Sequence, residues 1–66
     1  MIQIQLNGES QTLAACTLLE LLSRRGWVGK RVAIERNGAI VPKSQYDQVH
    51  LENDDRLEVV VAVGGG

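Results

Sequence analysis

The residues with the clearest chemical potential stand at the C-terminus, where Gly64, Gly65 and Gly66 directly follow the apolar run 59–63. Glycine loses more conformational freedom on ordering than any other residue, so residues 64–66 are expected to form a flexible tail. The α-carboxyl of Gly66 has a reference pKa of about 3.3–3.7 and is therefore an ionised oxygen nucleophile at neutral pH. An arm without side chains, extending roughly 10 Å, can enter a narrow enzyme channel.

Other reactive side chains offer weaker chemistry. Cys16 is the only cysteine; a packing role is favoured over a disulfide link to a partner, because no basic residue stands beside it in the sequence. His50 is the only histidine, has no Ser or Cys partner at motif spacing, and is expected in a turn region. One Cys and one His make no structural zinc site. The acidic segment 53–55 lacks the spaced ligands of a calcium loop and is expected to be a solvated turn. We therefore expect no self-contained enzyme.

Size and charge restrict the function further. A chain of 66 residues makes one small domain with a thin core. Seven basic and eight acidic residues give a net charge of −1, without the basic stripe or aromatic platform of nucleic-acid binders. The longest apolar run, 59–63, is too short to cross a bilayer. A single cysteine and an alternating N-terminus without a signal peptide favour the cytoplasm.

The first half of the chain predicts a hairpin followed by a helix. Residues 2–6 alternate apolar and polar side chains, Asn7-Gly8 is a tight-turn signal, and a return strand is expected over 9–13. Thr17 and Glu20 have the spacing of a capping box, with Cys16 and Leu21 at the positions of a hydrophobic staple. Gly26 suits the C′ position of a Schellman motif, in which Trp27 packs back onto the helix.

The second half predicts three more strands. Residues 32–35 alternate, Asn37-Gly38 marks another turn, and a short strand begins at 39–41 before Pro42 ends it. Residues 43–51 are expected to be irregular with one short helical turn, and the last strand spans 56–63. The predicted fold is α+β, in the order β-β-α-β-β-β, with one helix packed on one sheet.

The last strand also predicts an exposed apolar surface. Leu57 and Val59 point to one face, whereas Val60 and Ala62 point to the other. A single helix covers only one face, so Val60, Ala62 and Ala33 from the third strand form an uncovered patch beside the tail. We interpret this patch as a docking site for another protein; the alternative is a central strand that is hydrophobic because valine suits sheets.

Several segments together resemble a known family. They are IQLNGE (4–9), TLLELL (17–22), VAIERNG (32–38), IVPKS (40–44) and the terminal glycines. The chain resembles the ubiquitin-like β-grasp sulfur carriers over its whole length, most closely the ThiS family of thiamine biosynthesis. Its third terminal glycine departs from the family's minimal pattern of two. The resemblance implies a β-grasp domain over 1–63, with a mixed sheet of about five strands, and a tail over 64–66.

The resemblance also implies a protein substrate in place of an enzyme. A ubiquitin-activating-like adenylyltransferase would adenylate the Gly66 carboxylate, and a persulfide donor would convert it to a thiocarboxylate. Thiazole synthase would then take the sulfur. Gly64 and Gly65 would thread the channels of these partners, while Ala33, Val60 and Ala62 dock. ATP and magnesium would belong to the activating enzyme, so no cofactor or metal is expected on this chain.

Three alternatives remain open from the sequence. The first is a sulfur carrier like the small subunit of molybdopterin synthase, although the Val41-Pro42-Lys43-Ser44 segment favours the thiazole branch. The second is a ubiquitin-like modifier joined to lysines through Gly66. The third is an interaction module whose glycine end has no role.

Overall fold

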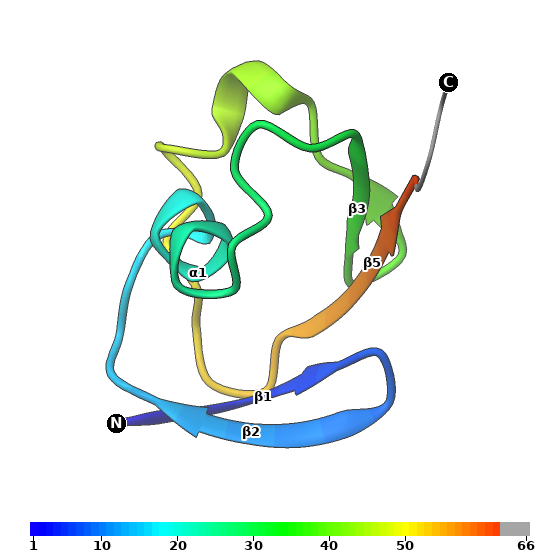
Figure 1. The fold of residues 1–66 in the computed structure, drawn as a ribbon. Helices are drawn as coiled ribbons and strands as arrows, with labels where there is room; N and C mark the ends of the chain where they lie inside the picture. Colours follow the sequence, from blue (N-terminus) through cyan, green and yellow to red (C-terminus); the bar gives the residue numbers. More distant parts are fainter. Residues whose placement is uncertain (63–66) are drawn as a thin grey trace.

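The computed structural model describes residues 1–62, and one helix packs against one face of a five-stranded sheet (Figure 1). The strands are β1 (Ile2–Leu6), β2 (Glu9–Leu13), β3 (Val32–Arg36), β4 (Ala39–Ile40) and β5 (Arg56–Val61). The helix is α1 (Leu18–Arg24), and a short 3₁₀ helix, η1 (Lys43–Gln45), follows β4. The predicted element order is therefore confirmed, including the short helical turn after Pro42.

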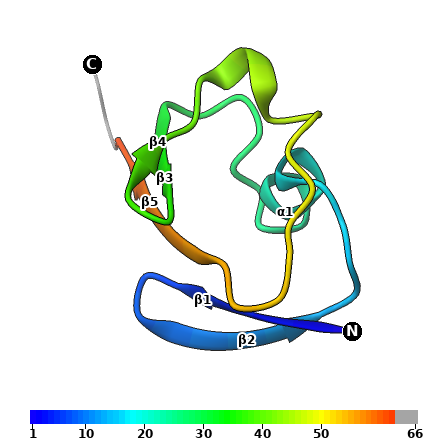
Figure 2. The ribbon, with the colours of Figure 1, turned by 180° about the vertical axis from the view of Figure 1, so that it is seen from behind.

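The sheet is mixed, with the strand order β2-β1-β5-β3-β4. β1 and β5 run parallel at its centre, and the other three neighbouring pairs are antiparallel. The last strand in the sequence thus inserts between the first hairpin and the second, as the view from behind also shows (Figure 2). The predicted α+β class with one helix on a sheet of five strands is correct.

Both ends of α1 have the predicted caps. The Thr17 hydroxyl accepts from the Glu20 amide at 3.2 Å, and the Thr17 amide donates to the Glu20 carboxylate at 3.0 Å. Hydrogen bonds from the Thr17 amide and hydroxyl lower the pKa of Glu20. At the other end Gly26 has φ +73°, its amide donates to the Ser23 carbonyl, and the Trp27 amide donates to the Leu22 carbonyl. This is the hydrogen-bond pattern of a Schellman motif.

The core lies between α1 and the sheet. Its most deeply buried side chains come from four elements and are Ile4, Leu18, Leu22, Ile34 and Leu57. On β5, Leu57 and Val59 are buried whereas Arg56 and Val60 are exposed, so the predicted alternation along this strand is correct.

The ends of two strands differ from the prediction. β4 comprises Ala39–Ile40, although the Val41 amide still donates to the Ile34 carbonyl at 2.9 Å before Pro42 removes the next donor. β5 ends at Val61, two residues earlier than predicted; Ala62 lies beyond the strand and Val63 lies outside the described residues. The apolar run 59–63 does not indicate where β5 ends, because this end depends on pairing with β3. Val61, the last residue of β5, pairs with Val32, the first residue of β3.

Candidate functional site

The candidate site is the C-terminal end of β5. Two Asn-Gly turns hold this strand in place. Asn7 adopts φ +51°; its side chain donates to the Val59 carbonyl at 3.1 Å and accepts from the Val59 amide at 2.7 Å. Asn37 adopts φ +53°, and its side-chain oxygen accepts from the Arg56 amide at 2.9 Å. Each asparagine thus makes a turn and also fastens the backbone of β5. Sequence reasoning predicted the turns but not these contacts.

A buried carboxylate fixes the beginning of β5. Asp55 is 4% exposed. Its carboxylate accepts hydrogen bonds from the Arg36 guanidinium at 2.9 Å, the Asn37 side-chain amide at 3.1 Å and the Glu52 backbone amide at 2.9 Å. Burial by itself raises the pKa of Asp55. The hydrogen bonds from Glu52, Asn37 and Arg36 outweigh that cost and lower the pKa below its ordinary value. Sequence reasoning interpreted this acidic segment as a solvated turn, which is wrong for Asp55.

The opposite end of β5 is the last described part of the chain. Val61 is the register partner of Val32 in β3, and the Ala62 amide donates to the Arg31 carbonyl at 2.8 Å. Backbone hydrogen bonding therefore continues one residue past β5, to Ala62, and Figure 1 shows the end of β5 at the periphery of the fold. The predicted tail residues Gly64, Gly65 and Gly66 lie outside the described residues.

Ala33, Val60 and Ala62 form what we call the strand-end patch. Ala33 and Val60 are direct cross-strand partners on the face that α1 does not cover. Val60 is 67% exposed, and Ala33 and Ala62 are exposed as well. The structure thus brings the three predicted docking residues to one end of one face. Whether a partner binds there stays a prediction.

Two acidic residues border the strand-end patch and were not identified from the sequence. Glu35 and Glu58 are exposed and face each other across β3 and β5. Like charges in this arrangement disfavour the sheet, and neither residue forms an ion pair within residues 1–62. Ile40, the register partner of Glu35, is 67% exposed and extends the apolar surface towards β4. The sequence contains a signal for these two acids, because Glu35 follows Ala33 by two positions and Glu58 precedes Val60 by two positions. Residues two apart in a strand lie on the same face.

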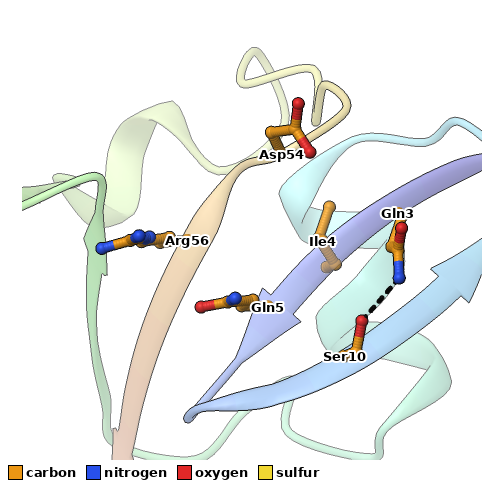
Figure 3. A pocket seen from close by; sticks show the side chains of 6 residues that line it. All are labelled: Gln3, Ile4, Gln5, Ser10, Asp54 and Arg56. Carbon is orange, nitrogen blue, oxygen red and sulfur yellow. Dashed lines mark hydrogen bonds between the residues drawn. The ribbon is translucent and has the colours of Figure 1, made fainter.

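The other half of the uncovered face is polar. Figure 3 shows Arg56 next to Gln5 on the adjacent strand, and, farther along β1, Gln3, whose side-chain amide donates to the Ser10 hydroxyl at 2.7 Å. These residues surround an open hollow of about 330 Å³. The uncovered face thus changes from polar over β1 and β2 to apolar at the end of β5.

The remaining candidate residues have structural surroundings. Cys16 is 7% exposed within the core, close to the helix start, which agrees with the predicted packing role. His50 is exposed between η1 and β5, and its carbonyl accepts from Arg36 at 3.2 Å. Over residues 1–62 we find no cluster of His, Cys, Asp and Glu suited to a metal ion. Within residues 1–62, no helix combines the length and the apolar character that a membrane span requires.

Comparisons with known proteins agree on one family. The model of the ThiS family matches residues 3–66. The chain is 37% identical to the sulfur carrier protein ThiS of Bacillus subtilis, covering 96% of this chain and 98% of the relative. It is 46% identical to part of a thiazole synthase of Magnetococcus marinus, covering 98% of this chain. The chain spans about a fifth of the length of the thiazole synthases that it matches.

A solved structure shares the fold. The crystal structure of the thiamine biosynthesis protein ThiS from Geobacter metallireducens superimposes with a TM-score of 0.81 at 25% identity, covering 98% of this chain and all of that one. The predicted β-grasp architecture is therefore confirmed. Sequence match, element order and superposition lead to one conclusion: the chain belongs to the ThiS family.

Proposed function

We propose that this chain is a sulfur carrier of thiamine biosynthesis, and that its reactive group is the Gly66 carboxylate. A carboxylate resists nucleophilic attack because it has no good leaving group. An adenylyltransferase solves this problem by joining one carboxylate oxygen to the α-phosphorus of ATP, with loss of pyrophosphate. ATP and magnesium are bound by that enzyme in this scheme.

Sulfur then replaces the activated oxygen. A persulfide on the donor attacks the acyl carbon of Gly66, and AMP leaves with the oxygen. A thiol cleaves the resulting acyl disulfide, which leaves a thiocarboxylate on Gly66 and a disulfide on the donor. Thiazole synthase takes the sulfur from this thiocarboxylate, while Gly64 and Gly65 occupy the channel that leads to its active site.

The observation that carries the proposal is that the match to the ThiS family extends through Gly66. Backbone hydrogen bonds fix the chain up to Ala62, shortly before that end. The strand-end patch supports the proposal, because an exposed apolar surface at the last described residues of the chain suits a partner enzyme that must capture the residues that follow. Among residues 1–62, Cys16 is buried, and the hydroxyl of Thr17, the bridge partner of His50, is engaged in the capping box with Glu20, so neither is a competing reaction centre.

Between the two biosynthetic branches, the relatives favour thiazole formation over molybdopterin formation. Two thiazole synthases contain a segment that is 42% and 46% identical to this chain. A carrier segment within the same polypeptide as a thiazole synthase suggests that the two act together. We therefore propose thiazole synthase as the acceptor enzyme.

Intact-mass spectrometry tests the proposal directly. The chain is incubated with the adenylyltransferase of its own organism, ATP, magnesium and a persulfide donor. We expect a mass gain that corresponds to the replacement of one oxygen by one sulfur. Removal of Gly66 should abolish the gain, whereas Asp54→Asn, in the turn before β5, should leave it unchanged.

The acceptor is tested by adding thiazole synthase to the sulfur-loaded chain, which should return the mass to its original value. Sulfur loss to molybdopterin synthase alone would assign the chain to the other branch. An isopeptide between Gly66 and a lysine would indicate a protein modifier instead. If an adenylyltransferase that is active on another carrier never changes the mass, the sulfur-carrier proposal is wrong.

A further inference from the structure

A second surface lies on the helix side of the molecule, where the segment between α1 and β3 meets η1 and its following turn. Leu22, Trp27 and Tyr46 form the base of a small hollow there. The Trp27 amide donates to the Leu22 carbonyl at 2.9 Å, and the Leu19 amide donates to the Tyr46 carbonyl at 2.9 Å. Because backbone hydrogen bonds fix both aromatic residues relative to α1, the hollow is preformed.

The rim of the hollow is apolar and accessible. Leu19 is 38% exposed and Val28 is 54% exposed, and both line the hollow. Its volume is about 50 Å³. A cavity of roughly 150 Å³ holds one benzene molecule, so this hollow suits part of a single aliphatic side chain and is too small for a cofactor ring.

The charge around the hollow has one sign. Lys30 and Lys43 line it, and no acidic side chain does. Arg36 is the only base in the ion pairs of residues 1–62, so both lysines lack an acidic partner within that range. The Arg25 guanidinium lies 6.0 Å from the Trp27 ring centre and adds positive charge nearby. Two acids, Glu20 and Asp47, directly follow the lining residues Leu19 and Tyr46 in the sequence, and both lie outside the lining.

The hollow is at the end of the sheet where β5 ends. Val32 lines it and is the register partner of Val61, while Arg31, the neighbour of Lys30, accepts from the Ala62 amide. Side chains alternate along β3, so the hollow and the strand-end patch lie on opposite faces of the same strand end. An enzyme that encloses the terminus can contact both surfaces.

We propose that this hollow docks an acidic segment of the enzyme that receives the C-terminal tail. One aliphatic side chain of that segment enters between Leu19 and Val28, and flanking carboxylates pair with Lys30 and Lys43. The inference rests on the proposed function for the identity of the partner. The chemistry of the occupant, an acidic peptide with one aliphatic anchor, follows from the hollow itself.

A model peptide tests the hollow independently of any enzyme. Asp-Glu-Leu-Glu-Asp is titrated into the chain, and binding is followed by the fluorescence of Trp27, the only tryptophan. Amide chemical shifts map the contact. We expect millimolar binding with shifts at residues 19–32 and 43–46, and binding weakened about tenfold when serine replaces leucine in the peptide. No binding, shifts centred on the strand-end patch, or equal binding of Lys-Lys-Leu-Lys-Lys would overturn the proposal.

The complete interaction is tested with the adenylyltransferase and the thiazole synthase of the same organism. The double variant Lys30→Glu/Lys43→Glu should weaken binding to at least one enzyme about tenfold or more, because each reversal replaces attraction by repulsion. Arg24→Glu, on the exposed side of α1, is the matched control and should bind within twofold of the original chain. Val28→Ser should weaken binding without a change of charge.

The outcomes separate the two proposals. Unchanged binding in the double variant, or an equal loss in Arg24→Glu, would overturn the docking inference while leaving sulfur transfer intact. If the original chain binds neither enzyme but the acidic peptide occupies the hollow, the proposed function fails. The preference of the hollow for an acidic peptide with one aliphatic side chain is then still supported. Circular-dichroism melts of each variant check that the exposed substitutions leave the fold unchanged.

Discussion

Replacement of Asp55 by asparagine should destabilise the fold strongly although the side chain keeps its size. Three hydrogen bonds converge on the Asp55 carboxylate, from Arg36 Nε, the Asn37 side chain and the Glu52 backbone, and a second Arg36 nitrogen forms an ion pair with it at 2.9 Å. A carboxamide has a single acceptor oxygen, and its NH₂ group would face donors. The substitution therefore leaves donors unpaired at a position that is 4% exposed.

The size of the expected loss in unfolding free energy follows from the surroundings of Arg36, the ion-pair partner of Asp55. Removing one partner of a buried ion pair costs about 3–5 kcal/mol. The Arg36 side chain is 27% exposed and still donates to the His50 carbonyl, so we expect about 2–3 kcal/mol. A chain of 66 residues has a free energy of unfolding of about 3–10 kcal/mol, so the loss is a large part of the total.

Urea denaturation followed by circular dichroism measures this loss. Asp54→Asn is the matched control, because it removes the same charge from the adjacent exposed residue. Asp54 has φ +71°, which asparagine tolerates, so we expect a change below about 0.5 kcal/mol. A loss of less than about 1 kcal/mol in Asp55→Asn, or an equal loss in Asp54→Asn, would refute the reasoning.

The same carboxylate predicts the pH dependence of stability. The pKa of Asp55 is lower in the folded chain than in the unfolded chain, where it is about 3.9. Its stabilising contribution is therefore complete above the unfolded pKa and is lost as the pH falls through the folded pKa. The difference in unfolding free energy between the original chain and Asp55→Asn should narrow as the pH is lowered from 7 to 3. A difference that stays constant or widens over this range would contradict the assignment.

Three further substitutions test other parts of the argument. Thr17→Ala breaks the capping box with Glu20 and should cost about 1 kcal/mol in urea denaturation; Thr17→Ser should recover most of it. Asn7→Ala loses both hydrogen bonds to Val59 and places alanine at φ +51°, so we expect the free energy of unfolding to fall by about 2–4 kcal/mol. A fall below about 1 kcal/mol would show that the hydrogen bonds to Val59 contribute little to stability. Val60→Asp should leave stability within about 1 kcal/mol but reduce binding of the adenylyltransferase at least tenfold in calorimetric titration; unchanged binding would exclude the strand-end patch as a docking site.

Local patterns in the sequence were sufficient for much of the fold. The capping box at Thr17, the glycine at position 26 and the two Asn-Gly turns each depend on neighbouring residues, and all appear in the structure as predicted. The alternation of Leu57 and Val59 with Val60 also indicated which side of β5 is exposed. The candidate patch was therefore predictable, because side-chain direction in a strand has a fixed period of two.

The contacts that hold β5 in position were not predictable in this way. Asn7 and Val59 are separated by 52 residues, and Arg36 and Asp55 by 19, so no local pattern relates them. The same is true of the acidic pair Glu35 and Glu58, which becomes a pair only through the register of β3 and β5.

The sequence by itself determined the elements, their caps and turns, and which side of β5 is exposed. These properties depend on residue type and on spacings of a few positions. Only the tertiary structure decided that β5 lies at the centre of the sheet, that Asp55 is buried, and that two different surfaces flank the same strand end. Strand order and register arise from burial and from hydrogen bonds between segments that are distant along the chain, and a local pattern does not contain that information.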